Sequence, residues 1–102
     1  MAGKKEKKRP FIKKRSELKP DALLSHFEEL AQRLEVKIIY GKGDFIGGGC
    51  QVMDQRYIVI NKVRPAEQQL HILAMEFYRL GLKGMYIVPV LRSFIEQEYK
   101  KY

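Results

Sequence analysis

The sequence predicts a single α+β domain, in which helices pack on one face of a three-stranded antiparallel sheet. Three observations predict this fold. Apolar residues recur at helical spacing in three segments, short β-branched stretches lie between the first and second of these, and 102 residues suffice for only one core. The apolar fraction of 45% is typical of a packed globular protein. We therefore expect the order helix, three strands, helix, helix.

The first half of the domain is predicted to contain one helix and the three strands. Pro20 suits the first turn of a helix over residues 20–35, and a strand is expected over 36–40. A polar break at 54–56 predicts a hairpin with strands at about 48–53 and 56–61. The apolar stripe of the helix consists of Leu23, Phe27, Leu30, Ala31 and Leu34.

Two further helices are predicted in the second half of the chain. One covers about residues 65–80, where Pro65 suits its start and Gly81 its end. The other begins near Pro89 and runs toward the C-terminus. The apolar positions of these two helices are Leu70, Leu73, Ala74, Phe77 and Leu80, and then Leu91, Phe94, Ile95 and Tyr99.

The positive charge is concentrated at the N-terminus. Residues 1–19 contain nine Lys or Arg and two acidic residues, so they carry +7 of the net charge of +8. Residues 20–102 contain eleven basic and ten acidic residues and carry +1. The sequence therefore predicts a flexible basic arm over residues 1–19, followed by a nearly neutral domain over residues 20–102. The candidate anion contacts of the arm are Lys4, Lys5, Lys7, Lys8, Arg9, Lys13, Lys14 and Arg15.

Three interpretations of the arm are open. It could bind nucleic acid through phosphate contacts, bind an acidic protein, or serve no defined partner. If nucleic acid is the main ligand, a basic track along the sheet could extend the contact from the arm. That track would consist of Lys37, Lys42, Arg56, Lys62 and Arg64.

The middle of the chain, from about Leu30 to Leu82, resembles the zinc metallopeptidase domain of the ImmA/IrrE family. The last predicted strand ends in Ile60-Asn61, and the following helix contains Ala74 and Glu76 in the order of the family's Ala-His-Glu-x-x-His motif. The two histidine positions of that motif are occupied here by Met75 and Arg79. The resemblance implies a minimal metallopeptidase-like core that has lost its zinc ligands.

The replacements at these two positions predict that the protein is not an enzyme. Two His residues four apart on a helix can hold Zn²⁺ while the intervening Glu activates a bound water. Met offers a neutral thioether and Arg a permanent cation, so we expect no metal, no cofactor and no catalytic residue. A zinc site improvised from His71, Glu76 and either Glu96 or Glu98 is the alternative. Without zinc, the former cleft face is a candidate binding surface, formed by His71, Met75, Glu76 and Arg79.

Other signals predict ordinary structural roles. The glycines between residues 41 and 49 favour a hairpin connection over a phosphate-binding loop, because the segment leads into a strand and not a helix. The single cysteine, Cys50, is predicted to be a buried structural thiol. Tyr86, Tyr99 and Tyr102 are candidates for an exposed aromatic patch. With no long apolar run, signal peptide or disulfide, the sequence predicts a cytoplasmic protein that does not enter a membrane.

Overall fold

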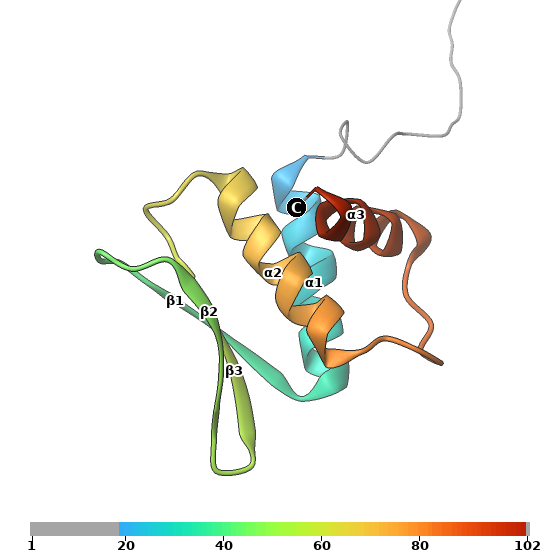
Figure 1. Ribbon diagram of the computed structural model, residues 1–102, viewed down its shortest axis with the longest axis horizontal. Helices are drawn as coiled ribbons and strands as arrows, with labels where there is room; N and C mark the ends of the chain where they lie inside the picture. The colour runs from blue at the N-terminus through green and yellow to red at the C-terminus, as the bar shows by residue number, and fades with distance from the viewer. Residues whose placement is uncertain (1–18, 102) are drawn as a thin grey trace, which may run out of the picture.

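The computed structural model describes residues 19–101, which form three helices and a three-stranded sheet (Figure 1). The α+β fold class is confirmed, and each element lies within two residues of its predicted position. Residues 1–18 of the predicted arm lie outside the described residues. The elements are α1 (Pro20–Leu34), β1 (Val36–Gly41), β2 (Gly47–Val52), β3 (Gln55–Asn61), α2 (Ala66–Leu80) and α3 (Pro89–Lys100).

The sheet is mixed, with β3 in the centre and the strand order β1-β3-β2. β2 and β3 form the antiparallel hairpin that the sequence predicts, but β1 pairs with β3 in parallel, from Val36 opposite Arg56 to Gly41 opposite Asn61. The prediction of an antiparallel sheet is therefore wrong for β1. The apolar run 58–60 of β3 suits a strand with neighbours on both edges, so the chain crosses at residues 42–46 to bring β2 to the far edge of β3.

All three helices lie on the same side of the sheet (Figure 1). α1 packs on β1, α2 packs on β2 and β3, and α3 packs on α1 and α2. Ile58 and Ile60 of β3 point toward the helices and are 1% and 0% exposed. In the helical layer Phe27 stacks on Phe77 with ring centroids 5.7 Å apart, and Phe94 meets Phe27 edge-on at 6.0 Å. This core fixes the position of α2 above β2 and β3.

Asn61 fixes the loop that leads into β2. Its side chain is 1% exposed, and its amide donates hydrogen bonds to the carbonyl oxygens of Gly43 at 2.8 Å and Phe45 at 2.6 Å. Gly47 then begins β2 with φ at +108°, where a Cβ atom would lie 2.7 Å from the Val59 carbonyl oxygen. A side chain at this position would be strained in backbone conformation and would also collide with β3. The polar end of the Ile60-Asn61 pair thus has a structural role.

Candidate functional site

The four residues predicted to share a cleft face lie on two different sides of α2. His71 lies against α3, whereas Glu76 lies against β2 with Arg79 bound to it. Met75 is half-buried and lies on α2 between the side that faces α3 and the side that faces β2. Residues 71 and 76 are five apart, which places them about 140° apart around a helix of 3.6 residues per turn. His71 and Glu76 therefore do not belong to one binding surface on a single face of α2.

Glu76 is held between Arg79 and the backbone of β2. The Arg79 guanidinium donates a hydrogen bond of 2.6 Å from Nη1 to Oε2 of Glu76. The Glu76 side chain is 17% exposed and that of Arg79 is 66% exposed. A Cβ atom added to Gly49 would overlap the Glu76 carboxylate, so the glycine provides the space that this carboxylate occupies. The residue that matches the general base of the peptidase motif is thus engaged by a neighbouring cation and packed on a strand.

His71 belongs to a second polar cluster, between α2 and α3. Its Nδ1 lies 2.8 Å from Oε1 of Glu98, and Lys101 Nζ lies 2.9 Å from Oε2 of the same carboxylate. Burial alone would raise the pKa of Glu98, but its hydrogen bonds with Lys101 and His71 outweigh burial and hold the pKa below its ordinary value. Glu98 is therefore ionised at neutral pH and links the end of α3 to α2.

The alternative zinc site is divided between these two clusters. The structure brings His71 to Glu98 but leaves Glu76 on the β2 side of the helix, and Glu96 is exposed. Within residues 19–101, no three His, Cys, Asp or Glu side chains are grouped so that they could hold a metal ion.

The predicted basic track is interrupted. Lys42 and Lys62 follow the parallel ends of β1 and β3, where the Lys62 N–H donates to the Gly41 carbonyl at 2.7 Å. Lys37 and Arg56 lie at the other end of these strands, about 15 Å away at the usual rise of a strand. Their side chains also project from opposite faces, because the register pairs Lys37 with Tyr57 and not with Arg56. These four residues of the predicted track thus lie at opposite ends of the strands.

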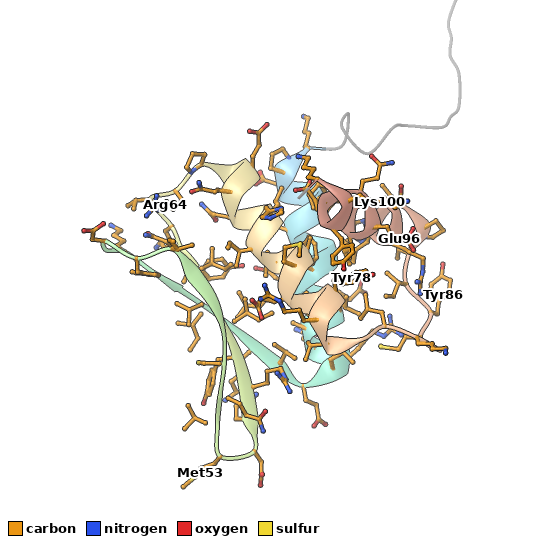
Figure 2. All side chains as sticks on the ribbon, in the orientation of Figure 1. Met53, Arg64, Tyr78, Tyr86, Glu96 and Lys100 are labelled. Carbon is orange, nitrogen blue, oxygen red and sulfur yellow. The ribbon has the colours of Figure 1, made fainter. Side chains whose placement is uncertain are left out.

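Tyrosines gather where α2 and α3 meet, but the set differs from the predicted one. Tyr78 stacks on Tyr99 with ring centroids 3.8 Å apart, while Tyr86 is 70% exposed in the connection between the helices (Figure 2). Tyr102 lies outside the described residues. Tyr78 also borders a hollow of about 410 Å³, whose other lining residues are Gly81, Leu82, Lys83, Arg92, Ile95 and Glu96.

The face of the sheet that points away from the helices is covered by none of the three helices, although the Phe45 ring lies over its Gly41 end. We call it the outer sheet face, and its side chains are Lys37, Ile39, Cys50, Val52, Tyr57 and Val59. Ile39 is 44% exposed and Val52 is 57% exposed. Cys50 is exposed, so the prediction of a buried thiol is wrong. This residue lies on an edge strand, and its side chain lies on the outer sheet face.

The outer sheet face was not predicted from the sequence. Its signal is the strand Tyr57-Ile58-Val59-Ile60, which is apolar at every position and so offers an apolar surface on both sides. The three helices cover only one of these sides.

No protein-family model matches this chain, and neither a curated protein nor a solved structure matches it. Within residues 19–101, no helix combines the length and the apolar character that a membrane span requires.

Proposed function

We propose that this protein is a non-catalytic interaction protein that binds a protein partner through the outer sheet face. The observation that carries the proposal is the exposure of Ile39 and Val52 beside the apolar rings and methyl groups of Tyr57 and Val59. An apolar sheet face is usually covered by a second layer. Contiguous apolar surface that stays uncovered is typical of a binding site.

The state of Glu76 supports a role without catalysis. A general base must accept a proton from a water or substrate within hydrogen-bond reach. Here the carboxylate accepts a hydrogen bond from Arg79 and packs against Gly49. Together with Met75 and Arg79 at the histidine positions, this arrangement favours a metallopeptidase-like domain that is catalytically silent, a pseudoenzyme of the ImmA/IrrE type.

Binding to nucleic acid is the alternative function, and the described domain favours it less. The residues of the predicted basic track are divided between the two ends of the sheet, and residues 19–101 contain twelve basic and ten acidic residues, a net charge of +2. A domain that neutralises several phosphates usually has a continuous basic surface. The basic arm remains the predicted site for contacts with nucleic acid or with an acidic protein.

Site-specific photo-cross-linking tests the proposed surface. A benzophenone amino acid would be placed at Ile39 or at Val52, with the same probe at Lys100 of α3 as the matched control, because Lys100 is exposed and distant from the sheet (Figure 2). We expect adducts with one defined protein from both sheet positions and none from position 100. Adducts of equal yield from all three positions, or none from the sheet positions, would refute the proposal.

A further inference from the structure

Three residues of β2 direct backbone N–H and C=O groups toward its free edge, the side of the strand away from β3. The turn at 53–54 has two residues, so Val52 and Gln55 form the hydrogen-bonded pair that closes the hairpin. Bonded and non-bonded pairs alternate along an antiparallel ladder, so every second residue back from Val52 directs its N–H and C=O toward β3. Gly47, Gly49 and Gln51 therefore direct theirs toward the free edge.

This edge lacks the features that protect most edge strands from pairing. Edge strands are commonly blocked by charged residues, by proline or by a covering segment. β2 reads GGGCQV and contains neither a charge nor a proline, and none of residues 19–101 forms a strand on its free side. Two of its three edge-directed residues are glycines, which leave the backbone open to a close approach.

We propose that β2 pairs antiparallel with β2 of a second copy, about a two-fold axis at Gly49. The proposal rests on the proposed function, because the pairing joins the outer sheet faces of two copies into one larger surface for the partner. In this register Gly49 lies opposite Gly49 of the second copy, and Gly47 lies opposite Gln51. All three edge-directed residues of each copy then have hydrogen-bonding partners, and two three-stranded sheets become one sheet of six strands. A shift of the axis to Cys50 would leave the backbone groups of Gly47 opposite a turn residue.

The outer sheet faces of the two copies adjoin in this register. Cys50 of each copy lies opposite Gly48 of the other, and the two Cys50 side chains are diagonal neighbours on this face. Cross-strand side-chain pairs on one face contribute to the stability of strand pairing. A two-fold interface of this kind is self-complementary.

The Glu76–Arg79 pair supplies charge complementarity on the side of the sheet that faces the helices. Glu76 lies at Gly49, and the Gly49 Cα atoms of the two copies would be about 5.5 Å apart as a hydrogen-bonded pair. Each 66% exposed Arg79 then lies within reach of Glu76 of the other copy. The four side chains form a ring of alternating charge around the axis, which links a feature of α2 to the pairing of β2.

Sedimentation equilibrium of the full-length chain over a range of concentrations tests this inference. We expect association from 12.0 kDa toward twice that mass. Gln51→Pro removes an edge-directed N–H without affecting the ladder to β3, and Val52→Lys places a charge on the pairing strand. Each change acts twice in a symmetric dimer, and we expect each to weaken association about tenfold or more. Val63→Lys is the matched control, because Val63 is 62% exposed and lies outside β2, and it should leave association unchanged.

Two measurements on the wild-type chain do not depend on how the variants fold. The Cys50 residues of the two copies would be diagonal neighbours on the outer sheet face, about 7–8 Å apart, so a short bismaleimide should link them. Hydrogen exchange of the Gly49 and Gln51 amides should slow as protein concentration rises. A mass of 12.0 kDa at every concentration without a Cys50 cross-link would overturn the inference, as would edge-amide protection independent of concentration. Adducts from Ile39 with a different protein would then still support the proposed function.

Discussion

The substitution Gly49→Ala tests whether the Glu76 carboxylate occupies the space above β2. In the structure a Cβ atom at position 49 would overlap this carboxylate, so the carboxylate must move when the methyl group is added. Movement separates Oε2 of Glu76 from the Arg79 guanidinium, which is 2.6 Å away. The effect of the alanine therefore depends on whether Glu76 is present.

The expected magnitudes follow from the two opposing effects. Alanine in place of glycine inside a strand stabilises a protein by about 0.5–1 kcal/mol, since it reduces the freedom of the unfolded chain. A hydrogen bond to a charged group contributes about 1.5–3 kcal/mol, and the 66% exposure of Arg79 favours the lower value. We expect Gly49→Ala to destabilise the wild type by about 0.5–1 kcal/mol, the difference between these effects. In a Glu76→Ala background the same change should stabilise by about 0.5–1 kcal/mol.

Urea unfolding of the four proteins of this double-mutant cycle measures the coupling between the two positions. We expect a coupling free energy of about 1.5 kcal/mol, the value assigned to the displaced hydrogen bond. Gly49→Ala with the same effect in both backgrounds would show that Glu76 does not lie against β2. The interpretation of Glu76 as an engaged carboxylate would then be wrong.

Two further predictions concern charge. Glu98→Gln should destabilise the domain by about 2 kcal/mol at pH 7 because it removes a buried carboxylate that interacts with both His71 and Lys101. A lowered pKa in the folded state means that this stabilisation is fully present above the ordinary carboxyl pKa of 4.5 and is lost as the pH falls through the lower folded-state value. The difference between wild type and variant in urea unfolding should therefore shrink as the pH falls below 4.5, and a constant difference would contradict this assignment. Deletion of residues 1–18, which reduces the net charge from +8 to +2, should abolish most salt-sensitive DNA binding in a titration, whereas retained affinity would indicate that the domain itself binds DNA.

The helices were predictable because the spacing of the apolar residues within each helix already indicates which of its faces is buried. The stripe from Leu23 to Leu34 defines the buried face of α1, and Pro89 defines the start of α3 within the same few residues. The hairpin was also predictable, since its two strands are joined by a short polar break. In all of these cases the information lies within about fifteen residues of chain.

The candidate site was predicted only in part, because its parts belong to different elements. The motif resemblance selected Glu76 and Arg79, which do lie together, but helix geometry separates His71 from them. Nothing in the spacing of α2 indicates that Gly49 provides the space for Glu76, because the contact joins residues 27 positions apart. The partner of His71 on α3 is equally distant in the chain, at Glu98.

The strand arrangement was predicted wrongly for a physical reason that also contributes to the exposure of Cys50. A simple antiparallel meander would place β2 in the centre of the sheet, with a strand on each side of it. Three consecutive glycines contribute few side-chain contacts, so they make a poor central strand, whereas β3 with its apolar run stabilises that position well. β3 therefore occupies the centre, which leaves β2 at the edge and Cys50 exposed. Predicting the arrangement requires a comparison of β2 with β3 as candidates for the centre of the sheet. Because β3 takes the centre, β2 has the free edge on which the proposed pairing depends.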